Sequence, residues 1–374
     1  MTTAVREALE PASEAQLREL LSSDLARADG RLQSGSDAVG ASDAITVAGL
    51  SKRYPNGTEA VRGISFRVRS GEFYGMLGPN GAGKSTTIGM LGTLVRPTTG
   101  RASVAGFDIA TRADAVRRRI GFAMQEIGVD ELATGREFLI LQGRLQGLAR
   151  AEAARRTRVL LRVVDLEHAA DERIGAYSGG MKRRIDLASA LIHLPPILFL
   201  DEPTEGLDPR ARVVIWETLE RLNQTLGMTI VLTTHYMEEA DRLCDRIGII
   251  DQGRIVVEGT PAELKASIGR QSLLLRYGRE FSPEALTKAR TVLGAQSAVH
   301  AAVASDGDLS VEVDDAAAFA PELLRILELA GTAPRALSIK QPTLEDVYLR
   351  YTGRSFESAE TGTDDEHGEG SDAA

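Results

Sequence analysis

The sequence predicts an α/β protein built on a parallel β-sheet, followed by a smaller α+β domain. Short apolar runs at 73–77, 197–200 and 229–233 are bounded by breakers or polar residues, which is typical of buried parallel strands. A glycine-rich loop and then a helical pattern follow the first run. Beyond about residue 268, strand-like and helix-like segments alternate in a different order, which indicates a second domain.

The composition is that of a globular protein with room for two domains. The chain has 374 residues, of which 43% are hydrophobic and 26% are charged. A net charge of −9 argues against a general nucleic-acid binder, and Cys244, the single cysteine, excludes an intramolecular disulfide. The N-terminus lacks the apolar segment of a secretory signal, and no run of eighteen apolar residues occurs, so we expect no membrane-spanning helix.

Changes in pattern divide the chain into four segments. Residues 1–43 are predicted to be a partly disordered extension, and 44–267 a main domain with a helical subdomain at about 113–185. Residues 268–352 are predicted to be a small accessory domain, and 353–374 an acidic disordered tail.

Hairpins are expected at both ends of the main domain. Alternating segments at 45–47 and 64–68 flank the turn signal Asn56-Gly57, and 247–257 has the pattern of a closing hairpin. In the accessory domain the predicted order is βαββαβ, which is the ferredoxin-like pattern, with one further helix at 343–351.

Residues 78–85 form a complete phosphate loop, Gly-Pro-Asn-Gly-Ala-Gly-Lys-Ser. Glycines let backbone N–H groups turn inward around a polyphosphate, the lysine can reach its β- and γ-phosphates, and the serine hydroxyl can bind Mg²⁺. The helix that follows adds partial positive charge at its N-terminus. The residues predicted to contact the nucleotide here are Gly78, Pro79, Asn80, Gly81, Ala82, Gly83, Lys84, Ser85 and Thr86.

Two adjacent carboxylates end the apolar run at 197–200. From there Asp201 would face a magnesium ion bound by Ser85, and Glu202 could polarise a water that attacks the γ-phosphate. A strand end with two solvated acids would have the same sequence, and only the preceding phosphate loop makes the catalytic interpretation strong.

Tyr177-Ser-Gly-Gly-Met181 opens a further helical pattern. With this segment, residues 45 to 265 resemble an ATP-binding cassette (ABC) ATPase, whose signature segment is Leu-Ser-Gly-Gly-Gln. The resemblance implies a P-loop NTPase fold: a RecA-like parallel-sheet core with an antiparallel β subdomain and a helical subdomain. It also implies a head-to-tail homodimer, in which Ser178, Gly179 and Gly180 of one copy contact the ATP bound by the other. Tyr177 and Met181 depart from the family pattern, and we expect this to affect subfamily more than activity.

The same resemblance assigns four more residues. Tyr54 is similar to the aromatic that stacks on adenine, and Asp208 to an aspartate at the dimer interface. Gln125 is similar to the glutamine that senses magnesium and the attacking water, and His235 to the histidine that contacts the γ-phosphate. The implied catalytic set is Glu202, His235, Gln125 and Lys84, and the implied Mg²⁺ ligands are Ser85, Gln125 and Asp201.

The motif around 177–188 and the ending Gln-Pro-Thr-Leu-Glu-Asp-Val-Tyr narrow the resemblance to the daunorubicin/doxorubicin-resistance type of exporter ATPase. This type implies ATP hydrolysis at the cytoplasmic side of the cell membrane. It also implies efflux of an antibiotic or other hydrophobic compound through a separate permease of the ABC-2 kind, with no nucleic-acid partner.

Two alternatives stay open. One is an ABC ATPase that moves no solute and acts on ribosomes or DNA. Another is that the accessory domain binds a small effector and regulates the ATPase. The residues identify neither the transported compound nor the direction of transport.

Overall fold

The computed structural model describes residues 43–269, 271–277, 283–305, 308–354 and 356. Contacts divide the chain into two compact units, with the boundary between Pro261 and Ala262. This boundary precedes the predicted domain start at 268, because helix α9 (Pro261–Ile268) associates with the last helix of the second unit, where Ser267 Oγ lies 3.4 Å from Tyr351 Oη. The predicted extension at 1–43 and the acidic tail lie almost entirely outside the described residues.

The first unit is built on a six-stranded sheet in the order β10-β9-β3-β8-β7-β6. Its strands are β3 (Phe73–Leu77), β6 (Ile120–Ala123), β7 (Ile197–Asp201), β8 (Thr229–Thr234), β9 (Arg246–Asp251) and β10 (Arg254–Gly259). All neighbours pair in parallel except β10, which forms the expected antiparallel hairpin with β9. Every residue of β3, β7 and β8 is buried, which explains their continuous apolar sequences and confirms the predicted parallel core.

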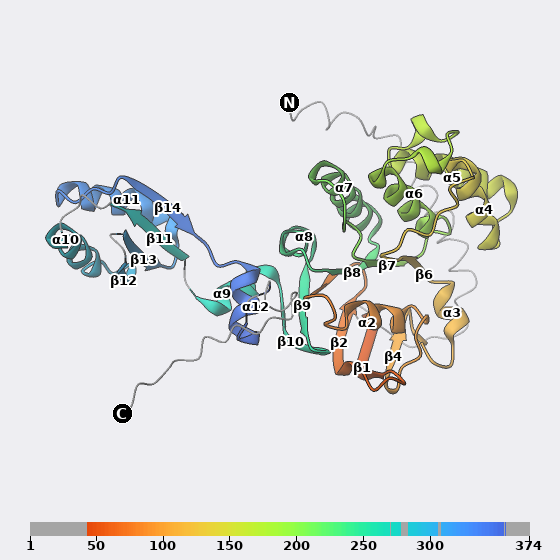
Figure 1. The fold of residues 1–374 in the computed structure, drawn as a ribbon, viewed down its shortest axis with the longest axis horizontal. Coiled ribbons are helices and arrows are strands. Elements are labelled where there is room, and N and C mark those ends of the chain that lie inside the picture. Colours follow the sequence, from red (N-terminus) through yellow and green to blue (C-terminus); the bar gives the residue numbers. More distant parts are fainter. Residues whose placement is uncertain (1–42, 270, 278–282, 306–307, 355, 357–374) are drawn as a thin grey trace. The chain divides into compact units, whose positions relative to one another are not determined.

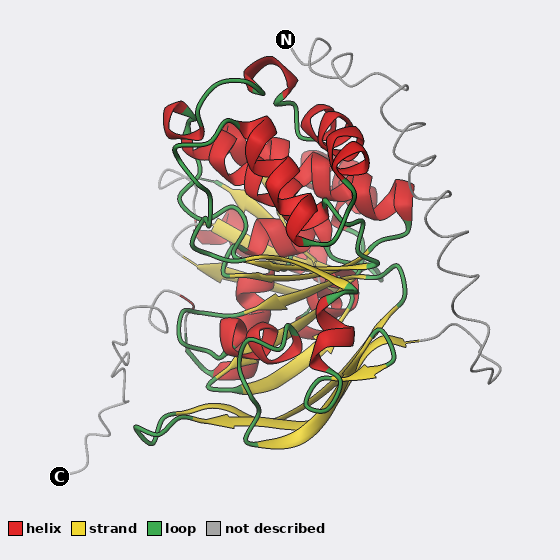
Figure 2. Cartoon of the chain, turned by 90° about the vertical axis from the view of Figure 1, so that its right-hand side faces the viewer, coloured by secondary structure: helices red, strands yellow, loops and turns green. Residues whose placement is uncertain are grey.

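A second, antiparallel sheet in the order β2-β1-β4-β5 covers one face of this core. Its strands are β1 (Asp43–Arg53), β2 (Glu59–Arg69), β4 (Thr99–Val104) and β5 (Phe107–Asp108). Helix α2 (Lys84–Leu91) lies between the two sheets (Figures 1 and 2). Ile88 of this helix belongs to one apolar cluster with Val47 of β1 and Phe199 of β7, so the two sheets and α2 share a core.

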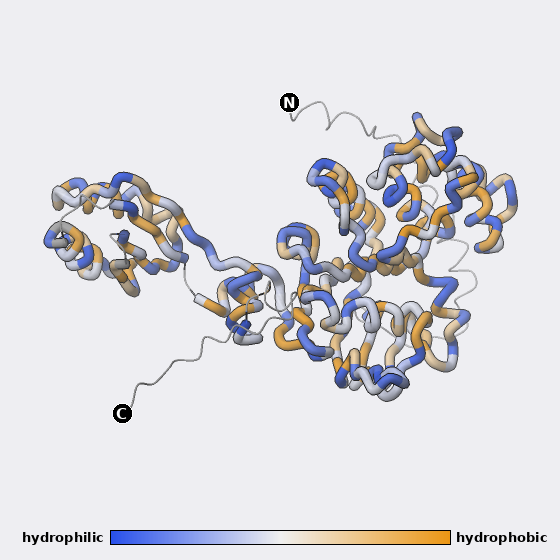
Figure 3. The backbone as a smooth tube through the Cα atoms, viewed as in Figure 1, coloured by the Kyte–Doolittle hydropathy of each residue, from blue (hydrophilic) through white to orange (hydrophobic). Residues whose placement is uncertain are grey.

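Most other helices of the first unit gather on the opposite face of the central sheet (Figure 2). They are α4 (Gly135–Leu145), α5 (Arg150–Val163), η1 (Glu167–Ala169), η2 (Ile174–Ala176), α6 (Gly179–Leu191), α7 (Pro209–Leu226) and α8 (Met237–Leu243). Helix α3 (Ala113–Arg117) instead lies on the side of α2, because its Val116 belongs to the core that the two sheets share. Hydrophobic and hydrophilic residues alternate along α4 and α5 (Figure 3), as expected for helices with one buried face. The segment from 113 is not wholly helical as predicted, because β6 within it pairs in parallel with β7.

The second unit has the predicted βαββαβ order. Its elements are β11 (Gln271–Arg276), α10 (Pro283–Gly294), β12 (Val299–Ser305), β13 (Asp308–Val313), α11 (Ala316–Leu329), β14 (Ala336–Lys340) and α12 (Leu344–Thr352). The strands pair in the antiparallel order β12-β13-β11-β14, which is ferredoxin-like. Leu273 and Leu309 of the sheet pack with Leu323 of α11 in a core of its own. Across both units, none of the helices in the described part of the chain is long and apolar enough to span a membrane.

Candidate active site

The candidate site lies at the carboxyl ends of three adjacent parallel strands, β3, β8 and β7. The phosphate loop follows β3, Asp201 ends β7 and precedes Glu202, and His235 follows β8. Parallel strands end at the same edge of a sheet, and ligands of α/β proteins bind outside that edge. The strand order therefore brings together residues that are far apart in the sequence.

The loop from Gly78 to Gly83 fits closely against its surroundings. A Cβ on Gly78 would lie 2.2 Å from the Ile250 carbonyl oxygen, and Gly83 has φ +106° with the Ala60 oxygen 2.4 Å from where its Cβ would be. Helix α2 starts at once after Gly83, with no side-chain cap and no acid in its first turn. The helix N-terminus thus offers its N–H groups and partial positive charge to an anion in the loop.

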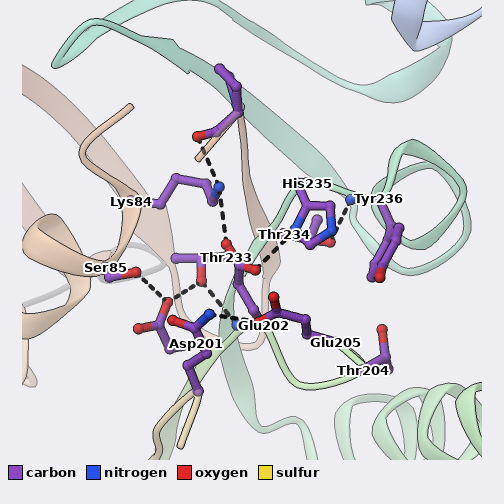
Figure 4. A network of polar contacts seen from close by, with 12 residues as sticks. Lys84, Ser85, Asp201, Glu202, Thr204, Glu205, Thr233, Thr234, His235 and Tyr236 are labelled. Carbon is purple, nitrogen blue, oxygen red and sulfur yellow. Dashed lines mark hydrogen bonds and ion pairs between the residues drawn. The ribbon is translucent and has the colours of Figure 1, made fainter. Parts of the chain in front are cut away.

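Lys84, which begins α2, is 97% buried and held by three oxygens. Its Nζ donates to the carbonyl oxygens of Gly78 at 2.7 Å and Pro79 at 3.0 Å, and it pairs with Glu202 Oε1 at 3.0 Å. Figure 4 shows this side chain running from the loop to the strand end. Its ammonium group therefore joins the phosphate loop to the carboxylate after β7.

Asp201 accepts two hydrogen bonds at one oxygen. Ser85 Oγ donates to Asp201 Oδ1 at 3.0 Å, and Thr233 Oγ1 donates to the same atom at 2.5 Å (Figure 4). Burial raises the pKa of Asp201 above its ordinary value, and the bonds from Thr233 and Ser85 offset this rise only in part. The described residues contain no group of three or more His, Cys, Asp or Glu that could hold a metal. A carboxylate beside a hydroxyl nevertheless fits Mg²⁺, which keeps waters and takes its remaining ligands from phosphates.

Glu202 is held in an unusual backbone conformation between two partners. Its φ is +47°, a left-handed value that costs on the order of 1–3 kcal/mol for a non-glycine residue and is typical of functional sites. Its Oε2 lies 2.9 Å from His235 Nδ1, and its Oε1 pairs with Lys84. Burial alone would raise the pKa of Glu202, but the hydrogen bond from His235 and the charge of Lys84 outweigh it and lower the pKa to about 2. The side chain is therefore an ionised carboxylate aimed into the site.

The other predicted residues have different contacts. Gln125, after β6, donates from Nε2 to Glu205 Oε2 at 2.6 Å. Asp208 and Ser178 cap helices: Asp208 Oδ1 accepts from the Arg210 and Ala211 amides at the start of α7, and Ser178 Oγ accepts from the Met181 amide at the start of α6.

Three further predicted residues lie in or beside the first turn of a helix. Gly179 and Gly180 form the first turn of α6, directly after the Ser178 cap. Tyr54 lies beside the start of α2, with its hydroxyl 3.4 Å from Thr86 Oγ1.

Sequence reasoning missed Thr233 and Glu239. Thr233 pairs with Asp201 in the parallel register of β7 and β8, so the strand order would have predicted its hydroxyl beside the carboxylate. Glu239 of α8 is fully buried and accepts from Thr204 Oγ1 and Trp216 Nε1, each at 2.8 Å. Trp216 of α7, which donates one of these bonds, is itself buried.

Comparison with known proteins agrees with this geometry. Residues 61–205 match the family described as ABC transporter, and residues 259–352 match the family described as ATP-binding protein DrrA1-3-like, C-terminal domain. The chain is 44% identical over 323 residues to the daunorubicin/doxorubicin resistance ATP-binding protein DrrA of Streptomyces peucetius, covering 85% of this chain and 95% of that protein. It is 38% identical over 311 residues to the linearmycin resistance ATP-binding protein LnrL of Bacillus subtilis (strain 168), covering 82% and 97%.

A solved structure gives the same result for the first unit. The dimeric, post-hydrolysis ATP-binding cassette MJ0796, bound to ADP and Pi, aligns with a TM-score of 0.54 and 28% identity, covering 58% of this chain and 98% of that one. The fold and the site thus define a P-loop ATPase. The chain belongs to the ABC transporter family, as an ATP-binding subunit with a DrrA-like C-terminal domain, which confirms the resemblance and the predicted fold class.

Proposed function

We propose that this chain hydrolyses ATP to drive efflux of a drug or other hydrophobic compound through a separate membrane permease. The observation that carries the proposal is the buried Lys84–Glu202–His235 network, in a chain that covers 95% of a drug-resistance ATP-binding protein. The named relatives are drug-resistance ATP-binding proteins, and residues 61–205 match the ABC transporter family, which together favour export over action on ribosomes or DNA.

The phosphate loop and the first turn of α2 bind the triphosphate through backbone N–H groups. Lys84 moves from Glu202 to the β- and γ-phosphate oxygens, and Tyr54 stacks on the adenine. Ser85 and Asp201, 3.0 Å apart, would hold Mg²⁺ with Gln125 as a third ligand, and the ion would neutralise phosphate charge.

Glu202 orients the attacking water and accepts its proton. The water oxygen forms a bond to the γ-phosphorus while the bond from that phosphorus to the ADP oxygen breaks, which releases ADP and inorganic phosphate. His235 is held by Glu202 at Nδ1, and the opposite edge of its ring contacts the γ-phosphate. Because Lys84 contributes to the low pKa of Glu202, transfer of Lys84 to the phosphates makes Glu202 a stronger base when ATP is bound.

A second copy completes each site. Its Ser178, Gly179 and Gly180 contact the γ-phosphate with the N-terminus of α6, and Asp208 lies at the interface. The first turn of α6 contains no acid, so its positive end is not neutralised locally. The dimeric state of the MJ0796 cassette bound to ADP and Pi supports this arrangement.

The permease, which we expect to be of the ABC-2 kind at the cytoplasmic face of the cell membrane, would contact the region around Gln125 and α4. Exposed apolar side chains occur within this stretch: Met124, Leu132, Leu141 and Leu145 are 53%, 79%, 50% and 71% exposed. Leu141 and Leu145 are one turn apart on α4 and therefore share a face, and neighbouring exposed apolar side chains can form the kind of patch that marks an interface.

Affinity purification of the tagged full chain from detergent-solubilised membranes tests the proposal. We expect an integral-membrane protein in equal amounts, and loss of that partner in a Leu141→Asp/Leu145→Asp variant that still binds ATP. A Leu329→Asp variant, changed at an 82%-exposed leucine of the second unit, is the matched control. Recovery with ribosomes and no integral-membrane protein would contradict the proposal.

A further inference from the structure

Arg183 lies near the start of α6, and its side chain is only 4% exposed. Its guanidinium group donates to three backbone carbonyls outside its own helix. Nε bonds the Pro203 oxygen at 2.7 Å, Nη2 bonds the Asp201 oxygen at 3.0 Å, and Nη1 bonds the Met124 oxygen. A planar guanidinium group with several N–H donors can hold three segments at once, whereas a lysine ammonium group acts as a single point of charge.

These three carbonyls belong to the two loops that carry the predicted chemistry. Met124 directly precedes Gln125, and Asp201 and Pro203 flank Glu202. Arg183 therefore fixes the backbone on both sides of the catalytic carboxylate and next to the glutamine. Asp186, one turn along α6, places Oδ2 3.5 Å from Nη1 and supplies a nearby negative charge.

The neighbouring Arg184 makes different contacts. Its Nη1 donates to the Val164 oxygen at 2.9 Å and the Asp165 oxygen at 3.0 Å, directly after α5. Arg184 thus holds α6 to another part of the helical region and, within the described part of the chain, makes no hydrogen bond to the loops after β6 or β7. Both arginines belong to α6, but Arg183 bonds the segments after β6 and β7, whereas Arg184 bonds the segment after α5.

We propose that Arg183 is a positioning residue that couples the two ATP sites of the dimer. The inference rests on the proposed head-to-tail arrangement. There, the N-terminus of α6 contacts the partner's ATP, while the loops at Met124 and Asp201–Pro203 act on the chain's own ATP. Through Arg183, closure of α6 on one nucleotide sets the position of Glu202 and Gln125 at the other.

The variants are Arg183→Lys and, as the matched control, Arg184→Lys. Thermal unfolding first establishes that both variants are folded. With Arg183→Lys we expect kcat to fall on the order of 10- to 100-fold with ATP affinity within about threefold, because misplaced catalytic groups affect turnover more than binding. Arg184→Lys should stay within about threefold of the unchanged chain in both quantities.

Mixed dimers separate coupling from a purely local role. Two copies that carry different affinity tags can be purified as a mixed dimer, here of one Lys84→Ala copy and one copy with an intact phosphate loop. The single working ATP site of this dimer uses Glu202 of the intact copy and Ser178–Gly180 of the Lys84→Ala copy. Arg183→Lys is then placed in either copy. We expect loss of hydrolysis in both cases, by roughly 3- to 30-fold when it lies in the Lys84→Ala copy, which is the usual range of coupling between sites.

Loss in only one of the two mixed dimers, no loss in either, or an equal loss with Arg184→Lys would overturn the inference. The proposed dimer itself is checked separately in the same preparation. If the dimer of one Lys84→Ala copy and one unchanged copy has no activity above the Lys84→Ala homodimer, the proposed function fails. If it is active and Arg183→Lys has no effect, only the coupling role fails.

Discussion

Lys84 Nζ and Glu202 Oε1 lie 3.0 Å apart, and their side chains are only 3% and 4% exposed. The residue that should bind the phosphates thus pairs with the residue that should activate water. We expect a phosphate that binds Lys84 to displace Glu202 from it, which would link ATP binding to the release of the proposed catalytic base. Breaking a buried ion pair from one side leaves the other charge unpaired, which gives this contact a large influence on both steps.

Glu202→Gln should lower kcat by roughly 10²–10⁴, the range typical of a lost general base. ATP binding should be retained or become tighter, because a neutral amide competes less for Lys84. Timed ATP hydrolysis assays and equilibrium ATP binding measure the two effects. Glu220→Gln is the control, because Glu220 of α7 is partly buried and paired with Arg242, as Glu202 is paired with Lys84. A Glu202→Gln chain that hydrolyses ATP at the unchanged rate would remove Glu202 from the chemistry.

The factor by which Glu202→Gln lowers kcat/KM should not depend on pH between 6 and 8. The pKa of Glu202 is lowered to about 2, so the carboxylate is ionised throughout this range. By linkage, its stabilising contribution is complete above the ordinary pKa near 4.5 and is lost only as the pH falls toward 2. We expect the ratio of kcat/KM for the unchanged chain and the variant to stay within about threefold, since kcat/KM reports ionisations of the free enzyme. A tenfold rise of that ratio with pH would show that Glu202 titrates in this range.

Tyr54→Ala should weaken ATP binding by about 1–3 kcal/mol, the range found for base stacking on an aromatic ring. Tyr54→Phe should bind nearly as well as the unchanged chain, because the ring is kept and the hydroxyl makes only a long contact, at 3.4 Å, with Thr86. Calorimetry of the two variants with ATP measures this difference. Equal affinities for the Ala and Phe variants would mean that the ring does not stack on the base.

Thr233→Val should raise the magnesium concentration needed for half-maximal hydrolysis by roughly 10- to 100-fold, the usual effect of losing a group that orients a metal ligand. The hydroxyl donates to Asp201 Oδ1 at 2.5 Å and offsets part of the rise that burial causes in the pKa of Asp201. Thr218→Val is a matched control, because among the described residues its hydroxyl bonds the Val214 carbonyl of its own helix and nothing at the site. The same magnesium requirement in both variants would exclude an orienting role for Thr233.

Local sequence patterns predicted the parts of the fold that have continuous or periodic apolar residues, or a glycine-rich loop at their boundary. Continuous apolar runs gave β3, β7 and β8, and the glycine-rich loop gave the start of α2. β6 was missed because its four residues lie among arginine-rich segments with helical spacing. Its assignment depends on pairing with β7, which no local pattern contains.

The site follows the same division. The motifs led to Lys84, Ser85, Asp201, Glu202 and His235, which the structure joins in one network, although their roles remain predictions. Thr233 could not be singled out, since its hydroxyl acquires a partner only through the strand order β8-β7. Arg183 has the sequence context of a charged residue on a solvated helix face, and only tertiary structure shows that it is buried on three carbonyls.

The most direct test of the account is complementation between two inactive copies. Lys84→Ala inactivates the phosphate loop, and Gly179→Asp blocks the start of α6 without steric conflict in its own chain, because a Cβ at Gly179 meets no atom within 4 Å. Each variant alone should hydrolyse almost no ATP. A two-tag mixed dimer contains one intact pairing of loop and α6, so we expect about half of the unchanged activity per dimer. If the mixed dimer stays as inactive as its parents, two copies do not share their ATP sites and the account is contradicted.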